Sequence, residues 1–309
     1  AAIAIKTVYE PPISDAVRAE STARGVPLYV YDGAYHETVA YQSLDLIRRD
    51  REELDKGKAL DELLTTHDGD RMRTKLSALV GVTGSTLQCF AFALRAGDTC
   101  SFYAMLDSVS AVLASAKEAC AAIESARVCR YHEHILAFVS YGSVAESERA
   151  AAEQRCVSLA SAEGSLHAGV SEPVLLSDGD LGIRQALAAA GAAKRHGEHL
   201  VRFSGLHLSA FASAAQADRL FMSASALYRS MLAGYDEEHG TELLRTAEAL
   251  VDHHGDVKSI AEELHQHPNT VRYRMRKMKA VLGVPHEDDK LFIRLLGLVF
   301  LPELDAPRR

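Results

Sequence analysis

The segment HPNTVRYRMRKMKAVLG, from His267 to Gly283, restricts the fold of this chain more than any other. Its apolar residues are spaced by four, three and four positions, so an α-helix would align them in one stripe: Val271, Met275, Met278 and Leu282. Five of the eight residues from Arg272 to Lys279 are basic and none is acidic. We therefore predict a helix that is buried along one stripe and cationic elsewhere.

The residues at the two ends of this segment predict where the helix begins and ends. His267 is expected to cap it. Pro268 suits the first helical position, where the missing N–H costs nothing. Gly283 follows the last residue of the apolar stripe and is expected to close the helix.

Two further helices are predicted before this one. Residues 241–255 predict a helix with Thr241 as its cap, and residues 256–266 predict a shorter helix with an apolar face. A short helix, a turn of three or four residues and a basic amphipathic helix are together typical of a helix-turn-helix domain.

The basic helix indicates double-stranded DNA as a partner. The whole chain has a net charge of −8, so any attraction to nucleic acid must come from a local basic surface. The first turn of such a helix can reach base edges: Asn269 can pair with adenine and Arg272 with guanine, while later cations meet phosphates. We predict that the DNA-binding residues are His267, Asn269, Thr270, Arg272, Tyr273, Arg274, Arg276 and Lys277. The alternatives are an ordinary solvated basic helix and a helix that binds an acidic protein partner.

The first fifty residues predict a partial α/β unit. Short apolar runs at 2–5 and 27–31 read as strands, and helices are expected at 14–25 and from His36 to Lys56. Strand, helix and strand with short connections indicate a parallel βαβ unit. Two strands make a poor domain, so we expect further sequence before Ala1. The charged stretch 48–58 is interpreted either as a solvated helix face or as a connecting helix that dimerises.

The middle of the chain predicts an α+β domain with one mixed or antiparallel sheet. In chain order the expected elements are a strand at 87–95, a helix at 102–126, strands at 127–132 and 134–141, a helix at 143–164, a strand at 166–171, a helix at 180–197 and a strand at 199–204. From Leu208 onward only helices are expected.

The predicted fold class is therefore multidomain α+β, with an all-α C-terminal domain. The expected domains are an N-terminal α/β remnant at 1–58, a linker or helical connector at 59–85, the central domain at 86–206, a helical connector at 207–240 and the helix-turn-helix domain at 241–309.

Neither a catalytic site nor a metal or cofactor site is predicted. The cysteines are five in number, scattered and without a CxxC pair, which favours reduced thiols in a cytoplasmic protein. His132 with His134, His253 with His254, and His265 with His267 are better interpreted as polar surface than as metal ligands. No apolar run is long enough to cross a membrane.

The basic segment also resembles a known family. HPNTVRYRMRKMKAVLG looks like the recognition segment of the PucR/CdaR family of bacterial transcription regulators, and ELLRTAEALVDHHGDVKSIAEELHQ and KLFIRLLGLVFL resemble the neighbouring segments. The matching residues are His267, Asn269, Thr270, Arg272, Tyr273 and Arg274. The family usually has an arginine where this chain has Pro268, which puts a DNA contact from that position in doubt.

The central region resembles the degenerate GGDEF-like domain of the same family, most clearly in HAGVSEPV and DLGIRQALAAAGAAKRH. A working diguanylate cyclase would carry R-Y-G-G-D-E-F in the hairpin between two central strands. This chain has Arg130-Tyr131-His132-Glu133-His134-Ile135 there, so the glycine pair is absent and Glu133 is the only acid. The resemblance therefore implies a domain without cyclase activity.

The resemblance implies a transcription regulator that responds to a small-molecule metabolite, with residues 1–58 as the remnant of its N-terminal sensory domain. A homodimer or larger assembly is expected, because one short helix reads too few base pairs to be specific. The alternative is a nucleotide-binding or nucleotide-cyclase-like enzyme with an appended DNA-binding domain.

Overall fold

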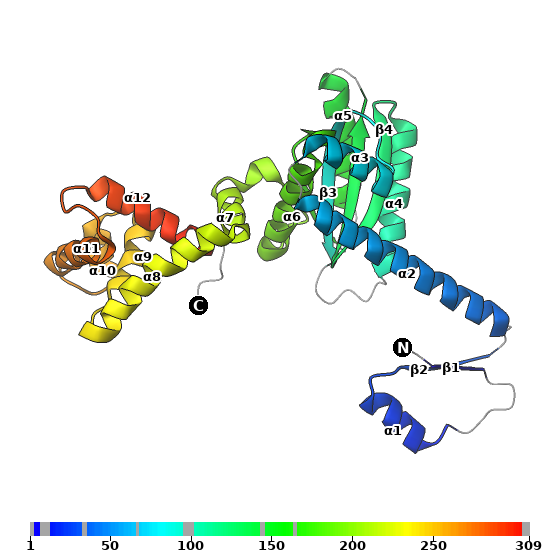
Figure 1. Ribbon diagram of the computed structural model, residues 1–309, viewed down its shortest axis with the longest axis horizontal. Helices are drawn as coiled ribbons and strands as arrows, with labels where there is room; N and C mark the ends of the chain where they lie inside the picture. Colours follow the sequence, from blue (N-terminus) through cyan, green and yellow to red (C-terminus); the bar gives the residue numbers. More distant parts are fainter. Residues whose placement is uncertain are drawn as a thin grey trace.

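A computed structural model describes residues 3–6, 13–32, 36–65, 68–94, 102–142, 146–162 and 166–304 (Figure 1). Along the chain, a two-stranded unit is followed by a six-stranded sheet with helices on both faces, and then by helices alone. This order confirms the predicted mixed α+β architecture with an all-helical C-terminal region.

The N-terminal unit consists of two parallel strands and one helix. Strand β1 (Ile3–Lys6) pairs with β2 (Leu28–Tyr31), and α1 (Asp15–Ala23) connects them. The Ser14 hydroxyl caps α1 by accepting a hydrogen bond from the Val17 N–H. The parallel βαβ arrangement predicted from the alternation of strand and helix patterns is confirmed.

Helix α2 (His36–Leu64) runs beyond the predicted end at Lys56. Its last turns carry Leu60, Leu63 and Leu64, which are buried against the central sheet. Helix α3 (Gly69–Val80) follows and buries Met72, Leu76 and Val80 in the same cluster. Helix α2 continues past Lys56 because its apolar residues Leu60, Leu63 and Leu64 lie at helical spacing and pack against the sheet.

The charged stretch 48–58 is docked on the central domain along one side of α2. The Asp50 carboxylate accepts hydrogen bonds from Arg130 Nη1 at 2.8 Å and from the Tyr103 hydroxyl at 2.5 Å. Glu53 is 7% exposed and accepts a hydrogen bond from the Arg130 backbone N–H at 2.8 Å. The prediction of a solvated helix face is therefore wrong for this side of α2. The charge pattern alone could not reveal these contacts, because the partners of Asp50 and Glu53 lie far along the chain.

The central sheet has the strand order β4-β5-β3-β6-β8, and β7 also pairs with β3. Strands β6 and β8 are parallel and the other pairs are antiparallel. The strands are β3 (Thr86–Leu94), β4 (Ile123–Tyr131), β5 (His134–Tyr141), β6 (Leu166–Val170), β7 (Val174–Leu175) and β8 (Leu200–Arg202). The single mixed sheet confirms the prediction for this region.

Alternate residues of β3 face two different cores. Phe90 and Phe92 pack in a cluster with buried residues of α4 (Phe102–Ala119) and α5 (Glu146–Ala162). Cys89 and Ala91 pack in the opposite cluster, which contains buried residues of α2, α3 and α6 (Gly179–His196). Both faces of the sheet are thus covered, which explains why β3 is apolar without interruption from Cys89 to Leu94.

Two predicted boundaries in this domain are wrong. The helix that starts at Phe102 ends at Ala119 rather than Ala126, because Ile123 onward pairs with β5. Ser125 in that strand is buried, and its hydroxyl lies 2.6 Å from the hydroxyl of Ser140 across the pair. The last strand stops at Arg202, where a 3₁₀ turn (Phe203–Leu206) begins.

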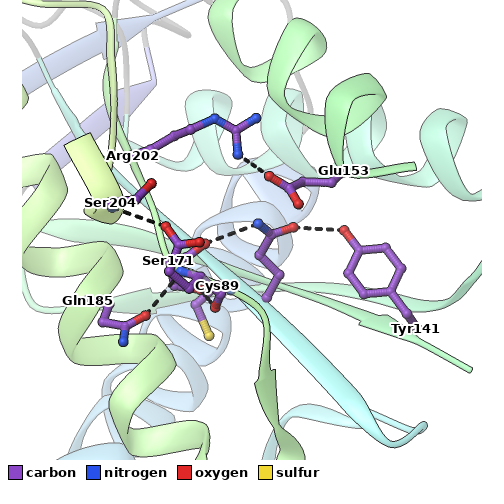
Figure 2. A network of polar contacts seen from close by, with 9 residues as sticks. Cys89, Tyr141, Glu153, Ser171, Gln185, Arg202 and Ser204 are labelled. Carbon is purple, nitrogen blue, oxygen red and sulfur yellow. Dashed lines mark hydrogen bonds and ion pairs between the residues drawn. The ribbon is translucent and has the colours of Figure 1, made fainter. Parts of the chain in front are cut away.

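A polar network crosses the middle of the sheet (Figure 2). The buried Gln88 side chain donates to the Ser171 carbonyl at 3.0 Å and accepts from the Tyr141 hydroxyl at 2.9 Å. The Glu172 carboxylate then accepts a hydrogen bond from the Ser204 backbone N–H at 3.0 Å. The network satisfies the buried amide and ties the sheet to the segment that leads into the helical region.

Cysteines of the described residues carry free thiols. Cys89, Cys129 and Cys156 are buried, Cys120 is half-buried, and Cys100 lies outside the described residues. Burial raises the pKa of Cys129 and of Cys156 to about 12, so these thiols stay protonated at neutral pH.

The C-terminal region is helical, as predicted, apart from a short terminal 3₁₀ turn. Its helices are α7 (Leu208–Ala217), α8 (Arg219–His239), α9 (Leu243–Asp252), α10 (Val257–Glu263), α11 (Pro268–Leu282) and α12 (Asp289–Phe300). The last five share one apolar core. Among the described residues, the structure contains no helix with the length and hydropathy needed to span a membrane.

Candidate DNA-binding interface

Helices α9, α10 and α11 enclose the core of the candidate interface. The apolar stripe predicted on α11 is confirmed, since Val271 and Met278 are fully buried and Leu282 is nearly so. The facing helices bury Leu250 from α9 and Ile260 from α10. The burial of this stripe fixes which side of α11 faces solvent.

Both ends of α11 are formed as predicted. His267 is the N-cap, and its Nδ1 accepts a hydrogen bond from the Asn269 backbone N–H at 3.2 Å. Pro268 occupies the start of the helix. Gly283 ends it with a φ of +69°, in the left-handed region that a residue with a Cβ rarely adopts.

The start of α9 differs from the prediction. Thr241 is not its cap, because the helix begins at Leu243. The Asp236 carboxylate, at the end of α8, instead accepts hydrogen bonds from the backbone N–H groups of Leu243 at 2.7 Å and Leu244 at 2.9 Å. The Thr241 hydroxyl donates to the same carboxylate at 2.5 Å. An acid from the preceding helix thus satisfies donors that a local cap would otherwise satisfy.

Several of the predicted DNA-binding side chains lie together on the open side of α11. His267, Asn269, Arg272, Tyr273 and Arg276 are exposed, and Thr270 is half-buried. Arg272 Nη1 donates a hydrogen bond to Asn269 Oδ1 at 3.1 Å. The two side chains predicted to read bases therefore contact each other at the first turns of the helix.

The remaining cations of α11 are engaged within the domain. Arg274 donates to Thr246 Oγ1 at 3.0 Å and to the Glu242 carboxylate at 3.0 Å, and its side chain is 14% exposed. Lys277 lies over the Tyr235 ring, with 5.6 Å between Nζ and the ring centroid, and a hydrogen bond with Tyr235 raises the pKa of Lys277. The structure thus separates Arg274 from the exposed group around Arg272.

Lys279, the last cation of the basic run, is buried. It is 2% exposed, donates to the His286 carbonyl at 2.8 Å and pairs with Asp289. These bonds fasten the end of α11 to the turn before α12. Only part of the basic run is therefore available to a ligand.

Sequence reasoning missed the residues that hold α11 in place. Glu242 and Thr246 lie four positions apart at the start of α9, and both bind Arg274. Their spacing is an ordinary helical one, so no local signal identifies them. Their partner lies 28 and 32 positions further along the chain.

Three of the histidines considered as metal ligands bond to other groups of the protein. His132 lies in the turn between β4 and β5, 3.0 Å from the Asp61 carboxylate. His253 pairs with Glu263, and His267 serves as the cap of α11. Across the part of the chain that the structure describes, no three histidine, cysteine or acidic side chains form a group able to hold a metal ion.

Helices α10 and α11, packed against α9, form a helix-turn-helix. Domains of this class bind DNA through the second helix of the pair. Residues 243–296 match a protein family described as the PucR C-terminal helix-turn-helix domain. The match covers the helices described above, from the start of α9 into α12.

One solved structure, "Crystal Structure of Regulator of Polyketide Synthase Expression from Bifidobacterium adolescentis", is 18% identical, with a TM-score of 0.39. The alignment covers 82% of this chain and 98% of that one. A search of curated proteins found no match.

Proposed function

We propose that the protein is a sequence-specific transcription regulator whose recognition helix is α11. One observation carries the proposal: α11 buries one stripe in the domain core and presents the bonded pair Asn269 and Arg272 at its exposed N-terminal turns. A helix held in this way can enter the major groove, where side chains of its first turns reach base edges.

The proposed contacts divide by exposure. Asn269 and Arg272 read bases, and His267, Thr270 and Tyr273 contact bases or nearby phosphates. The exposed Arg276 binds phosphates, and the half-buried Lys277 binds them by turning away from the Tyr235 ring. Because its guanidinium is bonded to Glu242 and Thr246, we assign Arg274 the role of orienting α11 rather than a base contact. Pro268 contributes no charge at the first helical position.

Substitution of Arg272 by alanine tests base readout. We expect Arg272→Ala to weaken binding to the specific site by about 1–3 kcal/mol and to relax specificity at one position. Lys277→Ala should instead weaken binding to all DNA similarly and reduce the salt slope by about 1. Fluorescence anisotropy with the gene's own upstream DNA and a scrambled duplex, at two salt concentrations, measures both. If the Arg272→Ala protein and the wild-type protein bind the specific site with equal affinity, base readout through this helix is refuted.

We also propose that the regulator acts as a homodimer that responds to a small-molecule effector. With a net charge of −8 on the whole chain, presenting α11 twice gives binding energy that one copy lacks. For the effector, a cavity of about 460 Å³ lies where β8 leads into α7, lined in part by His196, Arg202 and Ser209. Its volume suits a small metabolite.

We propose that the central domain is a GGDEF-like domain without catalytic activity. The turn between β4 and β5 holds His132 and Glu133, so one carboxylate is present where a cyclase needs tandem acids for Mg²⁺. Incubation with GTP and Mg²⁺, followed by chromatography of the nucleotides, should give no cyclic dinucleotide. Turnover that is lost in Glu133→Gln would favour the enzyme alternative.

A further inference from the structure

Helix α8 carries an exposed stripe with heptad spacing. Leu220, Ala224, Leu227, Met231 and Gly234 are separated by four, three, four and three positions, and all five are exposed. Leu220 is 81% exposed and Leu227 is 59% exposed. Apolar residues at this spacing are typical of a helix that pairs with another helix.

A different side of α8 is already used inside the chain. Leu232 is fully buried in the C-terminal core, and the buried Ser225 hydroxyl donates to the Val299 carbonyl at 2.7 Å. Tyr228 and Tyr235 pack against the same core. These contacts fix the rotation of α8 about its axis, so the heptad stripe is held away from the helix-turn-helix core.

We propose that this stripe binds the same stripe of a second copy of the chain, with the two α8 helices antiparallel. An antiparallel pair centred on Leu227 places Leu220 against Gly234 and brings Ala224 to within one position of Met231. The large side chains on either side of the centre, Leu220 and Met231, then lie against small ones, while the two Leu227 side chains meet each other at the centre. The same patch serves both copies, as a two-fold symmetric interface requires.

Charge at the two ends of α8 favours the antiparallel direction. Arg219 is exposed at the N-terminal end beside Asp218, whose carboxylate caps the helix by accepting a hydrogen bond from the Phe221 N–H. Glu237 and Glu238 are exposed at the C-terminal end. Antiparallel pairing brings Arg219 of one copy near these acids of the other, whereas parallel pairing brings the acids of both copies together. Like charges in contact oppose association, and opposite charges favour it.

The pairing deepens the proposed homodimeric regulator and rests on it. Tyr235, which contacts Lys277 of α11, lies eight positions from Leu227. At a rise of about 1.5 Å per residue, the two Tyr235 residues would be about 24 Å apart along the helix axis, before the widths of the domains are added. Half-sites one turn of DNA apart are separated by about 34 Å, a distance of the same order.

Sedimentation of the full-length chain tests the surface. We expect the wild-type protein to be a dimer. For Leu227→Glu we expect the dissociation constant of the dimer to rise by roughly 30-fold or more. The matched control is Leu298→Glu, which changes a leucine of similar exposure (54%) on α12 and should leave the dimer intact. A wild-type monomer, or a dimer that Leu227→Glu leaves unchanged, would overturn the proposal.

Cysteine cross-linking tests the direction without depending on those variants. Under mild oxidation, a mixture of Ala224→Cys and Met231→Cys proteins should form a disulfide-linked heterodimer located by peptide mass spectrometry. Neither protein alone should cross-link through its new cysteine, and the wild-type chain reports the background from natural thiols. Cross-linking of Ala224→Cys with itself would indicate parallel pairing and overturn the antiparallel arrangement.

The two proposals fail in different ways. If Leu227→Glu is monomeric while the wild-type protein shows no sequence preference for DNA, the pairing holds and the regulator does not. If the wild-type protein reads DNA specifically as a dimer that Leu227→Glu does not affect, the regulator holds and the α8 pairing is wrong.

Discussion

Replacing Gly169 with alanine is expected to lower the free energy of unfolding of the central domain by about 3–5 kcal/mol. Gly169 lies in β6 beneath α6, and a Cβ added there would be 2.1 Å from the Ala190 backbone nitrogen and 2.2 Å from the Ala186 carbonyl oxygen. Backbone atoms cannot rotate away as a side chain can. The helix would therefore have to move off the sheet, opening the packing of Ala186 and Ala190.

A second glycine provides the control for this substitution. Gly191 lies within α6, and a Cβ there would meet only the end of the Arg195 side chain, at 3.3 Å. Gly191→Ala should leave stability unchanged or raise it by about 0.5–1 kcal/mol, because alanine favours helix over glycine. Hydrogen exchange of peptides from β6 and α6 measures the central domain separately from the other domains. Unchanged protection in Gly169→Ala would contradict the close approach of helix and strand.

Much of the central fold could be predicted from periodicity. The run at 87–94 and the helix that ends at His196 have patterns that admit one interpretation, and both lie close to their predicted bounds. The segment after Ala119 admits two interpretations, because alanine and isoleucine suit a helix or a buried strand equally well. Pairing with β5 decides it, and pairing is not visible in a local window.

The candidate interface shows the same division between local and distant information. The cap at His267 and the end at Gly283 depend on neighbouring residues and were predictable. Which cations of α11 face solvent and which bind other parts of the protein could not be predicted, because Arg274 binds residues of another helix and Lys279 binds the turn that follows α11. Equal charges on one helix therefore have different roles, which only tertiary contacts distinguish.

Lys279→Ala measures the structural role of a cation in the basic run. We expect the free energy of unfolding of the C-terminal domain to fall by about 2–4 kcal/mol, since the change removes a buried side chain together with charged hydrogen bonds to His286 and Asp289. Lys279→Met should recover about half of the loss, because it keeps the buried apolar part of the side chain but loses the ammonium group that lies 5.6 Å from the Phe292 ring centroid. Chemical denaturation followed by circular dichroism, supported by hydrogen exchange of α11 and α12, measures both.

Arg276→Ala is the matched substitution on the exposed side of α11. It removes a cation three positions away that is open to solvent, so stability should change by less than about 0.5 kcal/mol. Its effect should instead be on DNA binding, as a reduction of the salt slope by about 1. Folded Lys279→Ala protein should keep the wild-type slope, because Lys279 is buried and contacts no ligand. If both variants reduced the slope equally, the burial of Lys279 could not be maintained in the DNA-bound state, and the basic run would act as one surface.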